Sequence, residues 1–218
     1  MVRNRAFAFA YRVSAAVAAA SGLLCGSGFS SGLKSALFYT QQSNILISGL
    51  FIYLAARTGA DLFLKGSSGG ACYCPRLHMA LTLTVSFTLL IFWSLCAPFK
   101  QGLKLWTYGN LTLHVFTPVL AIADYFLFCE PGHLKKRDIF LCVLIPATYI
   151  LIAAAFGFCG MVFYVEDGIA RYAPYPFMDF RSHWILSASF TASAAAVFCL
   201  CAAALYRLDK RRKRGERK

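Results

Sequence analysis

The sequence predicts an all-α membrane protein in which six transmembrane helices form one bundle. Of its 218 residues, 59% are hydrophobic and only 14% are charged, whereas a soluble domain is nearer half apolar and a quarter charged. The chain also contains six apolar segments, each close to the ~20 residues that cross a ~30 Å hydrocarbon core as a helix. No internal repeat and no separate soluble region is visible, so we expect a single domain.

Short polar connections separate the six predicted spans. The first span is long and contains Arg12, which favours a retained helix over a cleaved signal peptide. Pro98 follows the third span, Pro131 and Gly132 follow the fourth, and Pro146 is expected to kink the fifth. In chain order the predicted spans are 6–29, 39–64, 77–97, 107–128, 139–163 and 184–206, followed by a basic tail over 207–218.

Lysine and arginine are distributed unequally between the two sets of connections. If the N-terminus is cytoplasmic, 15 of them lie on the cytoplasmic side and 5 on the other, the bias that the positive-inside rule describes. Eight of the 22 lie in the tail over 207–218. We therefore predict that both termini are cytoplasmic. The tail is expected to contact anionic lipid, at about 1 kcal/mol per residue, and not nucleic acid.

The nine cysteines give only a weak signal for a metal site. Most of them lie inside apolar spans, where they behave as small hydrophobic residues. Cys72, Cys74 and His78 form a C-x-C-x3-H pattern, which lacks the fourth ligand of a structural zinc site. A loop with free thiols is the simpler interpretation, and neither a metal nor another cofactor is expected.

Polar side chains gather near the outer ends of the second and fourth spans. Those of the second span follow i, i+3, i+4 and i+8 spacing, which places them on one helical face. In the fourth span, Asn110 and His114 share a face, and His114 lies roughly 10 Å below the outer boundary at 1.5 Å per residue. Polar groups in lipid normally face the bundle interior or mark a functional site. The residues expected to converge are Thr40, Ser43, Asn44, Ser48, Asn110, His114 and, from the last outer loop, Asp179.

These residue types suit acyl transfer. A threonine hydroxyl is a weak nucleophile until a base takes its proton, and imidazole is the usual base near pH 7. We therefore assign Thr40 as candidate nucleophile and His114 as candidate base. Asp179 or Asn44 is a candidate for orienting the imidazole, and Asn110 for donating to an oxyanion. In the alternative interpretation, Thr40 and His114 bond each other only to satisfy two buried polar groups.

Three other charged residues are assigned structural roles. Arg57 and Asp61 are four residues apart near the inner end of the second span, a spacing that allows an ion pair. Asp124 lies near the inner end of the fourth span and does not share the face of His114. We expect it to have a structural partner. The candidate partners are Tyr125, Lys135 and Lys136.

Three stretches of the chain resemble the signature motifs of the bacterial Pr-six-Pr membrane proteins. They are FYTQQSNILI (38–47), LHVFTPVLAIADYFLF (113–128) and YPFMD (175–179). That family is similar to the androgen-induced-protein and androgen-dependent TFPI-regulating-protein superfamily of six-span proteins. In eukaryotic members, an intramembrane threonine and histidine hydrolyse fatty acid esters of hydroxy fatty acids. The resemblance places these two residues at Thr40 and His114, although the proline-rich last loop departs from the animal proteins.

Two functions therefore follow from the sequence. The first is hydrolysis of a lipid or fatty-acid ester, with Thr40 as nucleophile and His114 as base. The alternative is a non-enzymatic transporter or lipid-binding protein with a structural Thr/His pocket, although no inverted repeat supports transport. Membrane lipids are the expected partners in either case. The expected location is the cell membrane of a bacterium, or the endoplasmic reticulum or plasma membrane of a eukaryote.

Overall fold

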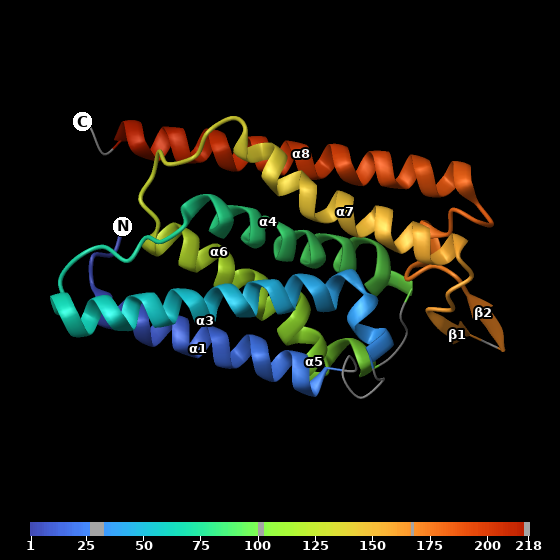
Figure 1. The fold of residues 1–218 in the computed structure, drawn as a ribbon, viewed down its shortest axis with the longest axis horizontal. Coiled ribbons are helices and arrows are strands. Elements are labelled where there is room, and N and C mark those ends of the chain that lie inside the picture. Colours follow the sequence, from blue (N-terminus) through green and yellow to red (C-terminus); the bar gives the residue numbers. More distant parts are fainter. Residues whose placement is uncertain (27–32, 100–102, 167, 216–218) are drawn as a thin grey trace.

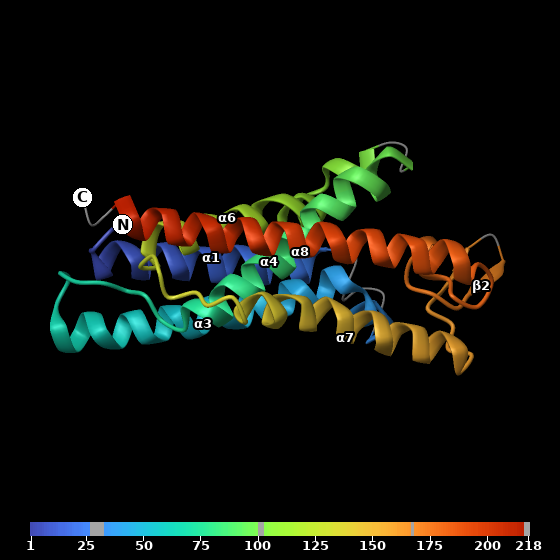
Figure 2. The same ribbon diagram turned by 90° about the horizontal axis from the view of Figure 1, so that it is seen from above.

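The computed structural model describes residues 1–26, 33–99, 103–166 and 168–215. Within these ranges, six helical segments are long and apolar enough to cross a membrane, which confirms the predicted all-α six-span bundle. The segments run roughly along one long axis, and both chain termini lie at the same end (Figures 1 and 2). We call this end the terminal end and the opposite one the far end.

The long helices have the following bounds. They are α1 (Arg5–Cys25), α3 (Tyr39–Lys65), α4 (Pro75–Ile91), α5 (Tyr108–Leu111), α6 (Thr117–Phe128), α7 (Asp138–Phe158) and α8 (Trp184–Gly215). Two π-turns, Phe92–Cys96 and Thr112–Phe116, continue α4 and join α5 to α6. Short 3-10 turns occupy Leu33–Leu37, Ala97–Phe99, Leu103–Trp106 and Pro176–Met178, and β1 (Tyr164–Glu166) pairs antiparallel with β2 (Ile169–Arg171).

The helices end close to the predicted positions, with two differences. The fifth span was predicted to reach 163, but α7 ends at Phe158, just before Gly160, whose φ of 83° breaks the helix. The sixth span does not give way to a separate tail, because α8 continues through the basic residues to Gly215. The predicted end of the first span at 29 and tail residues 216–218 lie outside the described residues.

Small residues let α1 lie very close to its neighbours. Ala8, Ala15 and Ala19 are fully buried on the face that packs against α3 and α6. At its far end α1 meets α5, where a Cβ built on Gly109 would come within 2.5 Å of the Gly26 Cα. Contact between backbones at this crossing therefore requires glycine at 109.

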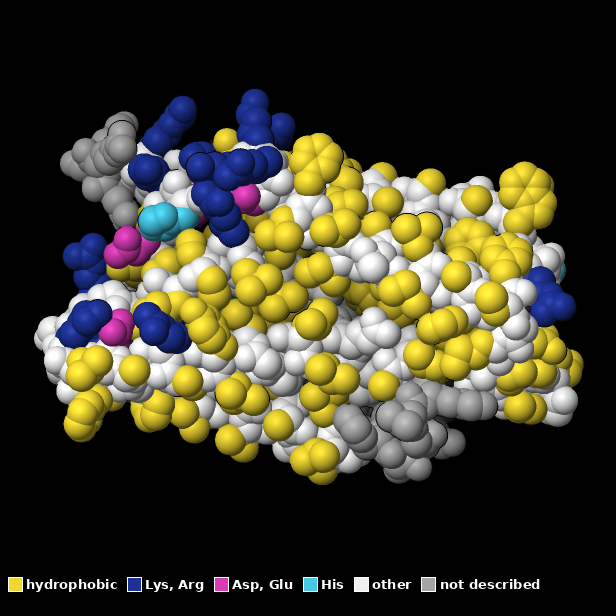
Figure 3. Space-filling model, viewed as in Figure 1, with side chains coloured by type: hydrophobic (Ala, Val, Ile, Leu, Met, Phe, Trp, Pro, Cys, Tyr) yellow, Lys and Arg dark blue, Asp and Glu magenta, His cyan; other side chains and the backbone are white. Residues whose placement is uncertain are grey.

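Helix α4 lies at the centre of the bundle and packs against α3, α6 and α7. Its buried residues Leu81 and Val85 join one apolar cluster with α3, and Met79 and Leu83 join a second with α6, α7 and α8. Helices α7 and α8 are the outermost pair, and many of their large apolar side chains face outward, as lipid contact requires. Figure 3 shows this distribution: most of the visible Lys and Arg lie at the terminal end, and hydrophobic side chains cover much of the rest.

A proline follows each π-turn. In the second π-turn, the Thr117 N–H bonds the Thr112 carbonyl, so the next carbonyl, that of Leu113, would be paired with the N–H of residue 118. Residue 118 is proline and has no N–H. The side-chain amide of Asn44 donates to the Leu113 carbonyl instead, at 3.2 Å. In Figure 2 the far ends of α4 and of the α5–α6 segment lean together to one side.

The connection between α7 and α8 covers the far end of α3. Tyr175 packs edge-on against Phe38, with ring centroids 5.7 Å apart, and stacks on Phe177 at 5.2 Å. Phe177 in turn lies 4.2 Å from the ring of Phe190 in α8. An aromatic layer therefore links the residue before α3 to the start of α8.

Candidate functional site

A buried ion pair joins α1 to α6 near the terminal end. The Arg12 Nε and Nη2 atoms donate to the two carboxylate oxygens of Asp124 at 2.9 and 3.2 Å, and both side chains are fully buried. The third donor, Nη1, bonds the Thr58 hydroxyl of α3 at 2.7 Å. The guanidinium also lies 5.2 Å from the ring of Phe128. The two charges are thus paired, and each guanidinium nitrogen donates a hydrogen bond, which favours keeping an ion pair in a low-dielectric interior.

His78 of α4 completes this cluster. Its Nε2 atom lies 3.2 Å from an Asp124 carboxylate oxygen, within ion-pair distance but without the alignment of a hydrogen bond. On the other side of the ring, Nδ1 lies 3.3 Å from the Cys129 sulfur. Four helices therefore contribute to one buried polar cluster, made of Arg12, Thr58, His78 and Asp124, which we call the Arg12 cluster.

The partner of Asp124 is not one of the three predicted ones. Lys135 and Lys136 lie beyond the end of α6 and are exposed, whereas Arg12 crosses the bundle at the same depth as the carboxylate. The predicted pairing of Arg57 with Asp61 also differs. Asp61 pairs with Lys65 at 2.8 Å and accepts a hydrogen bond from the Tyr73 hydroxyl at 2.6 Å.

The turns that carry Thr40 and His114 are brought together by Asn44. Its side-chain amide donates to the Thr40 carbonyl at 2.9 Å as well as to the Leu113 carbonyl. The His114 ring is buried and stacks on Phe92, with centroids 3.7 Å apart and planes 10° from parallel. Among the described residues, no hydrogen bond joins the Thr40 hydroxyl to His114. The two turns are therefore neighbours, joined through their backbone carbonyls by Asn44.

The predicted site residues Ser43, Asn110 and Asp179 each have hydrogen-bond partners of their own. The Ser43 hydroxyl lies 2.9 Å from the Thr88 hydroxyl of α4. Asn110 donates to the Leu105 carbonyl at 2.8 Å. The Asp179 carboxylate accepts from the Arg181 and Ser182 amides at 3.2 and 3.0 Å. Asn110 and Asp179 thus stabilise the local conformation of the connections in which they or their partners lie.

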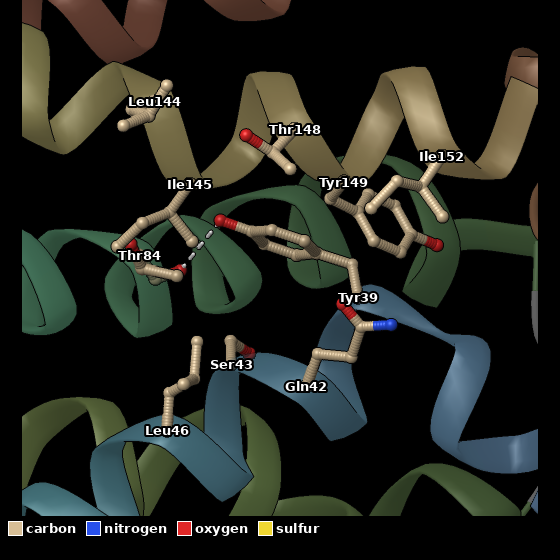
Figure 4. Close-up of a pocket in the computed structure, with 10 residues that line it drawn as sticks. All are labelled: Tyr39, Gln42, Ser43, Leu46, Thr84, Leu144, Ile145, Thr148, Tyr149 and Ile152. Carbon is tan, nitrogen blue, oxygen red and sulfur yellow. Dashed lines mark hydrogen bonds between the residues drawn. The ribbon is translucent and has the colours of Figure 1, made fainter.

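A groove of about 300 Å³ lies between α3 and α7, with α4 as its floor (Figure 4). Its rim is formed by Leu46, Leu144 and Ile152, which are between 43% and 60% exposed on membrane-spanning helices. The groove therefore opens sideways toward the hydrocarbon of a bilayer. Its full lining is Tyr39, Gln42, Ser43, Leu46, Thr84, Leu144, Ile145, Thr148, Tyr149 and Ile152.

Two tyrosines close the groove toward the far end. The rings of Tyr39 and Tyr149 lie 5.1 Å apart and bridge α3 to α7. The Tyr39 hydroxyl points along the groove and donates to the Thr84 carbonyl at 3.3 Å, as Figure 4 shows. No charged side chain lies among these ten described lining residues. The groove thus offers hydroxyl, phenol and amide groups within an otherwise apolar surface.

Comparison with known proteins identified no relative of this chain. No protein-family model, curated protein or solved structure matches the chain. Within the described ranges, no three His, Cys, Asp or Glu side chains are placed to hold a metal ion.

Sequence reasoning missed the Arg12 cluster, although a signal for it was present. Arg12 lies seven residues into the first span from the terminal end, and Asp124 lies four residues from the end of the fourth. Opposite charges at similar depth in two spans favour pairing, because a lone charge in lipid is costly. The contributions of Thr58 and His78 depend on how α3 and α4 are rotated, which spacing alone does not give.

Removing either charge of the buried pair should strongly destabilise the bundle. Arg12→Gln leaves Asp124 as an uncompensated buried carboxylate, and Asp124→Asn leaves an uncompensated guanidinium, at a cost of about 3–5 kcal/mol in each case. The measurement is the free energy of unfolding by SDS titration of the purified protein in mixed micelles.

Arg57→Gln is the matched control, because Arg57 is exposed and lies 5.8 Å above the Tyr73 ring. An exposed cation–π contact of this kind is worth about 1 kcal/mol or less. Equal losses for Arg12→Gln and Arg57→Gln would contradict the assignment of a structural role to the buried pair.

Proposed function

We propose that this multi-pass membrane protein binds a neutral lipid, whose acyl chain lies in the groove between α3 and α7. The observation that carries the proposal is the lateral opening of the groove within the membrane-spanning helices. A ligand dissolved in the bilayer can reach such a groove without passing through water. Its volume is at the lower end of the range for small-molecule sites, about 300–1,000 Å³.

The chemistry of the lining sets the class of ligand. Leu46, Leu144 and Ile152 at the rim suit an alkyl chain. The side chains of Gln42 and Thr148 provide uncharged hydrogen-bonding groups that match an ester or hydroxyl. A charged headgroup inside the groove would find no counter-charge among the described lining residues, which favours a neutral lipid.

Filling the groove should abolish lipid binding. Thr148→Phe adds an aromatic ring inside it, whereas Leu151→Phe places the same ring on the neighbouring outer face of α7, where Leu151 is 71% exposed. The measurement is photo-crosslinking of a diazirine-labelled neutral ester to the protein in nanodiscs, followed by peptide mapping. We expect labelling of 39–46 and 144–152 in the unmodified protein and in Leu151→Phe, and its loss in Thr148→Phe.

Even labelling of all lipid-facing helices, or labelling of 39–46 that persists in Thr148→Phe, would contradict specific binding in the groove. A thermal unfolding midpoint measured on both variants separates loss of binding from loss of fold.

Ester hydrolysis by Thr40 and His114 is a second candidate function, and the bridging by Asn44 is the observation that favours it. The bridge keeps the Thr40 turn beside the His114 turn, and Ser43, the residue before Asn44, lines the groove. The Asn44 side-chain oxygen is buried and has no hydrogen-bond partner among the described residues, so it is an available acceptor for orienting a donor. Catalysis would require His114 to turn from its stack on Phe92 toward the Thr40 hydroxyl.

Substitutions at Thr40 distinguish the two functions. If Thr40 is the nucleophile, Thr40→Val should abolish turnover of a fluorogenic fatty-acid ester, Thr40→Ser should retain part of it, and Thr40→Val combined with His114→Ala should cost little more than either change alone. Binding of the diazirine ester should survive in Thr40→Val. Turnover at the unmodified rate in Thr40→Val would exclude Thr40 as nucleophile and leave lipid binding as the function.

We also propose that the basic end of α8 contacts anionic lipid headgroups. Arg207, Arg211 and Arg214 recur at i, i+4 and i+7 and are exposed. Arg212 is engaged in the fold, because its guanidinium donates to the Phe126 carbonyl at 2.9 Å. The three exposed arginines are thus available for lipid headgroups, whereas Arg212 links α8 to α6.

A further inference from the structure

Two cysteines meet at the terminal end of the bundle, outside the groove. Cys72 lies in the connection between α3 and α4 and is partly exposed, whereas Cys129 lies directly after α6 and is buried. Neither has a role in lipid binding or in the Thr40 site. The sequence pattern C-x-C-x3-H drew attention to Cys72, but Cys129 comes from another part of the chain.

The contacts form a continuous chain of reactive groups. Cys72 packs against the apolar cluster that contains Cys129, and the Cys129 thiol and the Glu130 N–H are the polar groups that lower the pKa of its sulfur. The Cys129 sulfur lies 3.3 Å from His78 Nδ1, and His78 Nε2 lies 3.2 Å from the Asp124 carboxylate. A surface thiol is thus followed inward by a second thiol, an imidazole and a carboxylate held by Arg12.

We propose that Cys72 and Cys129 are a redox-active pair that forms a disulfide on reaction with a peroxide. Cys72 is the peroxidatic thiol because it reaches the surface. Cys129 is the resolving thiol because it is buried in the apolar cluster against which Cys72 packs.

The electrostatics of Cys72 support this assignment. The hydrogen bond from Cys129 is the largest influence and, with the Glu130 N–H and the nearby His133, outweighs partial burial and lowers the pKa of Cys72 to about 7. The thiolate is the reactive form of cysteine, so a large fraction of Cys72 is reactive at neutral pH.

The reaction balances as follows. The Cys72 thiolate attacks one oxygen of hydrogen peroxide, the O–O bond breaks, and hydroxide leaves and takes a proton to become water; the sulfur is oxidised to sulfenic acid. The Cys129 thiol then attacks the Cys72 sulfur, the S–O bond breaks, and the leaving hydroxide takes up the proton of Cys129 as water. Two thiols and one peroxide become one disulfide and two waters, and an external dithiol reverses the change.

The direct test is peptide mapping of the reduced full-length protein in detergent micelles after treatment with equimolar hydrogen peroxide and alkylation of the remaining thiols. We expect a peptide pair joined through Cys72 and Cys129, and its loss on addition of dithiothreitol. Cys129→Ser should leave Cys72 as a sulfenic acid that dimedone traps, and Cys72→Ser should abolish both products. Cys74→Ser is the matched control, two residues from Cys72, and should keep the linkage.

A second readout does not depend on oxidation. The rate of iodoacetamide alkylation of Cys72 should rise through a midpoint near pH 7, and Cys129→Ala should move that midpoint upward because it removes the thiol donor. Cys142→Ala, a buried cysteine of α7 outside this chain of contacts, should leave it unchanged. The proposal is overturned if both thiols are recovered as alkylated cysteines after peroxide treatment, or if Cys74 is linked to Cys129 as readily as Cys72 is.

Discussion

The buried pairing of Arg12 with Asp124 is the interaction on which the arrangement of the bundle depends. Each charge alone would cost several kcal/mol in a low-dielectric interior, so neither helix can be placed without the other. Arg12 donates to Asp124 and Thr58, which fixes α1 against both α6 and α3. With His78 beside the carboxylate, α4 joins them. The relative rotation and depth of four helices are thereby set at the terminal end.

The far end is built differently, because its helices are irregular and held by aromatic side chains. The π-turns and the prolines that follow them leave backbone groups that side chains such as Asn44 must satisfy. Helix α7 packs on α4 and α8, and the Tyr39–Tyr149 contact bridges it to α3 across the groove. A firmly bonded end and a laterally open groove suit a protein whose ligand arrives from the bilayer.

The Arg12 cluster lies beside the proposed thiol pair and away from the groove. His78 lies between the Asp124 carboxylate and the Cys129 sulfur, so the groups that stabilise the fold also face the thiol pair. The groove and the Thr40 turn lie toward the other end of α3. The proposed lipid binding and the proposed thiol oxidation therefore involve separate residues of one bundle, and variants of one need not disturb the other.

Hydropathy predicted the number, order and approximate bounds of the spans, because length and apolar content are local properties of the chain. Charge placement could have predicted the pairing of Arg12 with Asp124, but proximity in sequence favoured Lys135 and Lys136 as partners. The π-turns were not predictable. Pro98 and Pro118 indicate that a helical hydrogen bond is missing, but they do not indicate which hydrogen-bonding pattern the helix adopts before the proline. The order and depth of the spans predicted that His114 lies near Thr40. They could not predict the orientation of the His114 side chain, because the irregular backbone of the π-turn directs its ring toward Phe92.

The central claim is that Arg12 and Asp124 stabilise the bundle as a pair, and a double-mutant cycle tests it most directly. The free energy of unfolding would be measured by SDS titration for the double variant Arg12→Gln/Asp124→Asn beside the two single variants. Neutralising both charges removes the uncompensated one, so the double variant should be at least as stable as either single variant. Because each single change costs about 3–5 kcal/mol, the coupling energy should be at least about 3 kcal/mol, the upper end of the range seen for residues in contact. Losses that simply add would show that the two residues act independently, and would contradict the account.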